Sequence, residues 1–69
     1  SNRIDLPASQ LAPGDYYLVS PGARFMRSEK TDVVVEKIER REYETVVYFN
    51  GGEKIFYLHN DIIRNVVPA

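Results

Sequence analysis

An Asn-Gly pair between two apolar runs is the feature that most constrains how this chain folds. Residues 43–49 and 53–58 are rich in β-branched and aromatic side chains, and Asn50-Gly51-Gly52 separates them. Asn and Gly tolerate the positive φ that a type I′ turn requires, so the pattern predicts a β-hairpin that turns at Asn50 and Gly51. The hairpin indicates a β protein and leaves the biochemical function open.

Length and composition narrow the class of protein. A chain of 69 residues is one domain with a small core, and the lack of cysteine rules out disulfides and thiolate zinc sites. A single histidine among scattered carboxylates argues against a structural transition metal, so we expect no cofactor. No apolar run approaches the roughly 20 residues that span a bilayer. No signal-peptide pattern is present, so we expect a cytoplasmic protein.

Turn signals divide the first part of the chain. Residues 1–13 are expected to be an N-terminal arm or tag remnant, with one helical turn at 8–11 between two prolines. A first strand at 16–19 and a long loop at 23–31 follow. The second strand, 32–40, places Val33 and Val35 on one face and Ile38 on the other. A bulge near Glu36 and Lys37 would return Ile38 to the core.

The last segment completes the layout of a small barrel. Asn60 or Asp61 is a suitable N-cap for a single helical turn before a last strand at 66–67. The order is strand, long loop, strand, turn, strand, hairpin, strand, helical turn, strand. This order predicts an all-β fold over residues 14–69, a five-stranded SH3-like barrel with a short helical turn before the last strand. The expected core is Leu11, Leu18, Val33, Val35, Ile38, Val47, Phe49, Ile55 or Phe56, Leu58, Ile62 and Val66.

Two segments also carry a resemblance to a known family. Residues 47–53, Val-Tyr-Phe-Asn-Gly-Gly-Glu, and 61–66, Asp-Ile-Ile-Arg-Asn-Val, resemble the second half of a Tudor domain. Gly14-Asp15 is similar to the Gly-Asp pair that opens many such barrels. The resemblance covers the layout of most of residues 14–67, and it implies the Tudor-like or SH3-like barrel architecture.

The densest positive cluster lies on the longest loop, where binding residues concentrate. Arg24, Arg27 and Lys30 surround Phe25, and arginines can grip phosphate or carboxylate through two hydrogen bonds. The alternative is that Phe25 packs into the end of the barrel while the charges are solvated. Outward-facing Tyr48 and Tyr57 could stack on bases, or could instead form cross-strand pairs that support the sheet.

The remaining charged residues favour structural roles. Lys37, Arg40 and Arg41 alternate with glutamates, which indicates cross-strand ion pairs on a solvated face. His59 lies beside Asp61, but no nucleophile stands at a characteristic spacing from it. We therefore expect a surface or capping role for His59 and no enzyme activity.

The net charge only partly distinguishes a nucleic-acid partner from a protein partner. The net charge of −1 argues against binding nucleic acid by bulk electrostatics, although a local patch stays open. We expect a noncatalytic binding module with nucleic acid as the leading partner, held by Arg24, Phe25, Arg27 and Lys30 with Tyr48 and Tyr57. The alternative is a protein–protein interaction or assembly module.

Overall fold

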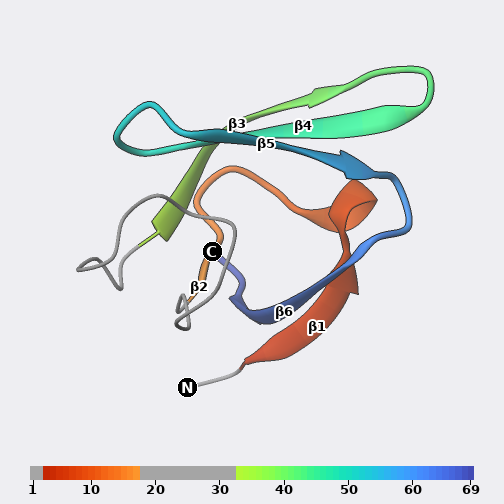
Figure 1. Cartoon of the computed structure of the whole chain (residues 1–69). Helices are drawn as coiled ribbons and strands as arrows, with labels where there is room; N and C mark the ends of the chain where they lie inside the picture. The colour runs from red at the N-terminus through yellow and green to blue at the C-terminus, as the bar shows by residue number, and fades with distance from the viewer. Residues whose placement is uncertain (1–2, 18–32) are drawn as a thin grey trace.

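The computed structural model describes residues 3–17 and 33–69, and within them the protein is mostly strand. The elements are β1 (Ile4–Pro7), the 3₁₀ turn η1 (Ala8–Gln10), β2 (Tyr16–Tyr17), β3 (Val33–Arg40), β4 (Glu44–Phe49), β5 (Lys54–Leu58) and β6 (Ile62–Val67) (Figure 1). The strands follow the order β1-β6-β2-β3-β4-β5, and every pairing is antiparallel. The all-β prediction is confirmed. No helix in the described ranges is long and apolar enough to cross a membrane.

Strand β3 belongs to both halves of this sheet. Its first residues pair with β2 and its later residues pair with β4. Between them the register shifts at Glu36, because Val35 lies opposite Phe49 while Lys37 lies opposite Tyr48. The expected bulge is therefore confirmed, and Ile38 packs against the core as a result. Figure 1 shows β3 turning away from β4 and β5 toward β2.

The sheet curls without closing into a barrel. No pairing between the described strands joins β5 to β1, so the expected closed barrel is not found. Instead η1, which follows β1, bonds to the turn that follows β5, and so connects the two edges of the sheet. The Ala8 N–H donates to the Asp61 carbonyl at 2.8 Å, and the Ser9 N–H donates to the His59 carbonyl at 2.9 Å. Pro7 and Pro13 bracket η1, whose position confirms the helical turn expected there.

The β4–β5 hairpin forms, but its turn differs from the one expected. The Phe49 N–H donates to the Glu53 carbonyl at 2.8 Å, which leaves residues 50–52 as a three-residue loop. Positive φ occurs at Gly51 (88°) and Gly52 (91°) and not at Asn50, so the type I′ prediction is wrong. Asn50 bonds to β3 instead. Its N–H donates to the Val34 carbonyl, and its Oδ1 accepts from the Val34 N–H, both at 3.0 Å.

The expected helical turn before the last strand is also wrong. The Asp61 carboxylate accepts from the Leu58 N–H at 2.8 Å, and the Asp61 N–H donates to the Leu58 carbonyl at 3.1 Å. Asp61 thus closes a tight turn rather than capping a helix, and β6 begins at the next residue. Ile62, expected in the core, is 55% exposed, and Ile63 is buried in its place.

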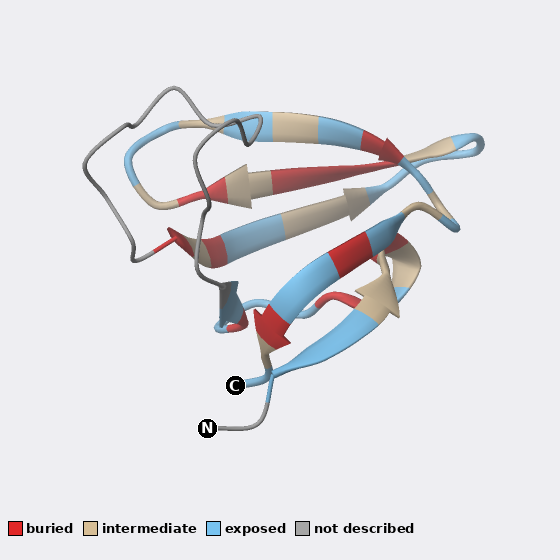
Figure 2. Cartoon of the chain, turned by 60° about the horizontal axis from the view of Figure 1, so that its bottom comes forward, coloured by how far each residue is buried: buried red, intermediate tan, exposed pale blue. Residues whose placement is uncertain are grey.

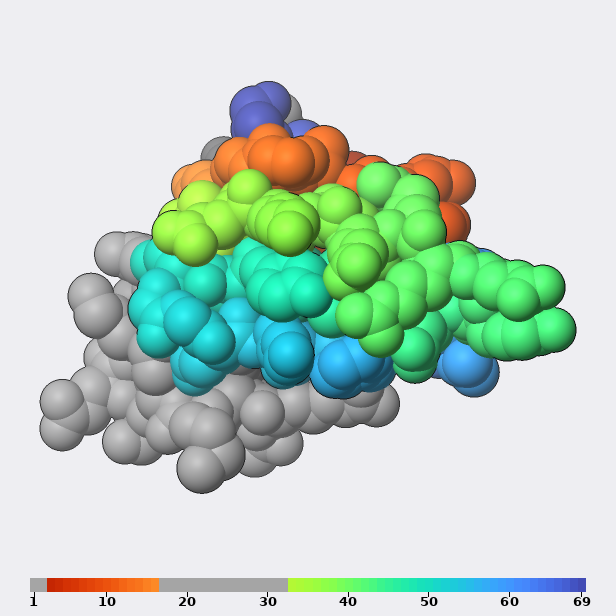
Figure 3. Space-filling model, turned by 90° about the horizontal axis from the view of Figure 1, so that it is seen from above, coloured from red at the N-terminus to blue at the C-terminus, as the bar shows by residue number. Residues whose placement is uncertain are grey.

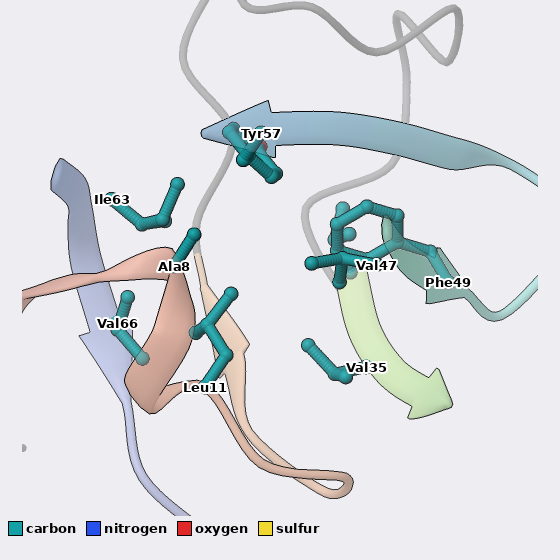
Figure 4. Close-up of a cluster of buried hydrophobic side chains, with 9 residues drawn as sticks. Ala8, Leu11, Val35, Val47, Phe49, Tyr57, Ile63 and Val66 are labelled. Atoms are coloured by element: carbon teal, nitrogen blue, oxygen red, sulfur yellow. The ribbon is translucent and has the colours of Figure 1, made fainter. Parts of the chain in front are cut away.

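The core lies between the two halves of the curled sheet and under η1 (Figures 2 and 4). Leu58 was expected there, but it is 59% exposed because strand alternation turns Tyr57 inward and Leu58 outward. The expected Leu18 lies outside the described residues. The buried cluster consists of Ala8, Leu11, Val33, Val35, Val47, Phe49, Tyr57, Ile63 and Val66, with Leu6, Ile38 and Ile55 packed against it.

Two polar side chains, those of Asp15 and Arg40, form hydrogen bonds to backbone groups of segments distant in the sequence. Asp15 is 5% exposed, and its carboxylate accepts from the Ala12 N–H at 2.8 Å and from the Ala69 N–H at 2.9 Å. The Arg40 guanidinium donates to the Ser9 and Leu11 carbonyls, each at 2.7 Å. Arg40 therefore caps the carbonyl end of η1 and fixes it to β3.

Candidate functional site

The best-defined cluster of charged and aromatic side chains covers the surface of β3, β4 and β5 that points away from the core. Figure 3 views the molecule from the side on which these strands lie. The cross-strand register places the rows Lys37–Tyr48–Lys54 and Glu39–Val46–Phe56 on this surface. We call it the outer face, formed by Lys37, Glu39, Arg41, Glu44, Tyr48, Lys54, Phe56 and Leu58. Val46 belongs to the same side of the sheet by register but is fully buried.

Tyr48 lies at the centre of one row with a lysine on each neighbouring strand. The Lys37 Nζ is 5.2 Å from the centroid of its ring, and the Lys54 Nζ is 5.8 Å from the same centroid. Both distances allow cation–π attraction. The Tyr48 hydroxyl donates to the Glu39 Oε1 at 2.9 Å, which fixes the ring. Tyr48 points outward as predicted, in a half-buried position.

An ion-pair network holds the carboxylates of the outer face. Arg41 Nη2 lies 3.0 Å from Glu39 Oε1, and Arg41 Nη1 lies 3.5 Å from Glu44 Oε1. Hydrogen bonds from Tyr48 and then Arg41 lower the pKa of Glu39, and the hydrogen bond to Glu39 raises the pKa of Tyr48. The bond to Glu39 also raises the pKa of Arg41. One arginine therefore pairs with both glutamates.

The predicted ion pairs therefore form at only one of three basic residues in that segment. Arg41 pairs with Glu44 on the neighbouring strand as expected, whereas Arg40 bonds to carbonyls of η1 and Leu11. Lys37 rests over the Tyr48 ring. Within residues 3–17 and 33–69, neither Lys37 nor Lys54 forms an ion pair. Their ammonium groups are available to an anionic ligand that approaches the outer face.

Phe56 is the aromatic residue of this face that sequence reasoning missed. Its ring is 45% exposed, with the Arg41 Cζ at 5.5 Å and the Lys54 Nζ at 5.6 Å from its centroid. Tyr57 was expected to lie beside Tyr48, but it is 8% exposed and belongs to the core. The register decides this, since Val46 lies opposite Phe56 and shares the outward face of β4 with Tyr48. The length of the hairpin loop is the signal that would have identified Phe56.

The other predicted site residues lie outside the described part of the structure. Arg24, Phe25, Arg27 and Lys30 all fall between residues 18 and 32, so their role stays a prediction. Among the described residues, no cluster of His, Asp or Glu side chains could hold a metal ion.

His59 has a structural position between the hairpin and the β3–β4 turn. Its Nδ1 lies 2.8 Å from the Oγ1 of buried Thr45, and its Nε2 lies 3.1 Å from the Glu42 carbonyl. Because a carbonyl can only accept, Nε2 carries a proton and donates it there. With both ring nitrogens engaged, His59 links two turns of the sheet.

Comparisons with known proteins identified no relative of this chain. No protein-family model matches the chain, and neither a curated protein nor a solved structure matches it.

Proposed function

We propose that this protein is a noncatalytic binding module whose outer face binds single-stranded nucleic acid. The observation that carries the proposal is the exposed Phe56 ring, which lies between the cations of Arg41 and Lys54. Proteins that hold single strands combine aromatic platforms for the bases with cations for the backbone. Phe56 supplies the platform, while Lys37 and Lys54 supply positive charge with no carboxylate bonded to it in the described structure.

Charge on the outer face supports the same partner. Three cations, Lys37, Arg41 and Lys54, share the face with two carboxylates, Glu39 and Glu44, so the face carries one net positive charge although the chain carries −1. The cations Arg24, Arg27 and Lys30 of the 23–31 loop, with Phe25, are proposed as a second part of the site. The modest total charge favours a short site rather than a long groove.

We also propose that the fold is a Tudor-like or SH3-like barrel that stays open on one side. Strands β2 to β5 follow one another in space, β6 returns beside β2, and the bent strand β3 belongs to both halves. That arrangement supports the resemblance of the hairpin and of residues 61–66 to Tudor domains. Strand β1, paired with β6, is an addition to the five strands expected.

Titration of labelled single-stranded oligonucleotides at low and moderate salt tests the binding proposal. Phe56→Ala should weaken binding by about 5- to 150-fold, which corresponds to about 1–3 kcal/mol of lost stacking. Lys37→Ala and Lys54→Ala should each flatten the plot of log affinity against log salt by about 0.7. Tyr43→Ala is the matched control, because Tyr43 is 77% exposed and lies outside this face. No binding at about 100 μM protein in low salt refutes the nucleic-acid proposal.

A protein partner is the second candidate, favoured by the neighbouring apolar side chains of Phe56 and Leu58. They are 45% and 59% exposed and follow each other on the same side of β5. A protein interface anchored there would lose affinity in Phe56→Ala and Leu58→Ala. Its affinity would depend little on salt, which separates it from a nucleic-acid site.

A further inference from the structure

Strand β5 ends the sheet with backbone groups that no described residue binds. In an antiparallel pair, successive residues turn their N–H and C=O alternately toward and away from the partner strand. The bond from the Phe49 N–H to the Glu53 carbonyl sets this alternation, so Ile55 bonds to β4 while Lys54 and Phe56 point outward. The outward groups of Leu58 are taken by Asp61. The open edge therefore consists of two N–H and two C=O groups, at Lys54 and Phe56.

The opposite edge of the sheet is protected in a way that β5 is not. Strand β1 contains Pro7, which has no N–H, and the charged Asp5. Proline and charge are common means of keeping an edge strand from pairing with another chain. On β5 the only charge is Lys54, and the exposed Phe56 ring lies beside its open backbone groups. The β5 edge is thus the one suited to strand addition.

We propose that two copies of this chain dimerise by antiparallel pairing of their β5 edges, with Lys54 opposite Phe56 of the second copy. A hydrogen-bonded pair exchanges both of its N–H···O bonds. In this register the pairs Lys54–Phe56 and Phe56–Lys54 use all four open groups on each strand. The strand is thereby complementary to itself, as a two-fold symmetric interface requires.

Other registers of the two β5 strands either leave edge hydrogen-bonding groups unpaired or bring like charges together. Phe56 opposite Phe56 would place Lys54 opposite Leu58, whose N–H and carbonyl are already bonded to Asp61. Lys54 opposite Lys54 would bring like charges together, which destabilises a cross-strand pair. Only the register that pairs Lys54 with Phe56 avoids both costs.

The side chains fit the same register. Directly opposite residues have Cβ atoms about 4.5–5.5 Å apart, so Lys54 would contact the Phe56 ring of the second copy. Within one chain the Lys54 Nζ already lies 5.6 Å from the centroid of its own Phe56 ring. Each ring would then meet cations from both copies, a favourable cation–π arrangement. The two outer faces would join on one side of a continuous sheet.

Sedimentation equilibrium of the protein without ligand, at about 10 μM to 1 mM, tests the proposal. We expect the mass to rise toward that of a dimer, and the Phe56 amide to exchange with solvent more slowly at the higher concentration. The Leu58 amide, bonded within the chain to Asp61, is the internal reference and should not change. Phe56→Pro removes an N–H that makes no bond inside the described fold, so it should abolish the dimer.

A second variant keeps the proposal testable if Phe56→Pro does not fold. Phe56→Lys places a cation opposite Lys54 of the second copy and should weaken dimerisation at least tenfold. Ile62→Lys is the control, because Ile62 is 55% exposed on β6, away from this edge. A monomer at every concentration overturns the dimer, even if it still binds oligonucleotides. A dimer that Phe56→Lys leaves intact overturns the β5 interface, and a monomer whose Phe56 amide is protected by an added extended peptide assigns the edge to another protein.

Discussion

The buried carboxylate of Asp15 should contribute more to stability than any other single acidic side chain of the described structure. It is 5% exposed and accepts two backbone N–H groups, one from Ala12 and one from Ala69, at 2.8 and 2.9 Å. It thereby joins the turn before β2 to the residues after β6. We expect Asp15→Ala to loosen both segments at once.

The magnitude follows from the two hydrogen bonds. A bond to a charged group contributes about 1.5–3 kcal/mol, so the pair represents about 3–6 kcal/mol. Ala12 and Ala69 are exposed, so in the variant water can bond to their N–H groups and recover part of this free energy. We expect a net loss of about 2–4 kcal/mol, against a total stability of roughly 3–10 kcal/mol for a chain of this length. At about 4–8 °C per kcal/mol, the Tm should fall by at least about 8 °C.

Thermal and urea unfolding followed by circular dichroism would measure this loss. Asp5→Ala is the matched control, because the Asp5 carboxylate accepts one exposed N–H, from Asn65, at 3.2 Å. Its removal should cost no more than about 1 kcal/mol. If Asp15→Ala is no more destabilising than Asp5→Ala, the carboxylate does not fasten the two segments and the reasoning is refuted.

Two further predictions concern the hairpin and the outer face. Gly51→Val places a β-branched residue at φ 88° and should cost about 1–3 kcal/mol, whereas Gly51→Asn should cost less; equal melting temperatures would contradict the turn geometry. Glu39→Gln should lower the pKa of Tyr48 toward its ordinary value of 10.0, as followed by NMR of the ring. Because the folded-state pKa of Tyr48 is raised, its contribution to stability is complete below pH 10.0 and is lost as the pH rises through the raised pKa. A Tyr48 titration that Glu39→Gln leaves unchanged would show that the negative charge of Glu39 does not raise this pKa.

Local chemistry made several elements predictable from the sequence. Pro7 and Pro13 limit the helix between them to one turn, because proline lacks the N–H that a longer helix needs. Glycines between two β-branched runs predict the hairpin, since few other residues adopt positive φ. The bulge at Glu36 followed from the phase of Val33, Val35 and Ile38, which only an extra residue can bring to one face. Each of these features depends on residues close together in the chain.

The length of the hairpin loop, two residues or three, decides which face of the sheet each aromatic residue of β5 lies on. Asn50 has enough freedom for a type I′ turn, but in the fold it gains two hydrogen bonds to Val34, and the loop becomes one residue longer. A shift of one residue turns every side chain of a strand to the other face. Phe56 therefore lies on the outer face while Tyr57 joins the core. The sequence pattern alone allowed either.

Contacts between distant segments decided the rest. Asp61 suits a helix cap and a tight turn equally well, and pairing of β6 with both β1 and β2 favours the turn and an immediate strand. The residues around Ile4 have no period of their own, and they become a strand because β6 offers them a partner. Sequence by itself thus determined which turns and strands are possible near the hairpin. Only the tertiary structure decided their pairing, because long-range hydrogen bonds leave no local pattern in the chain.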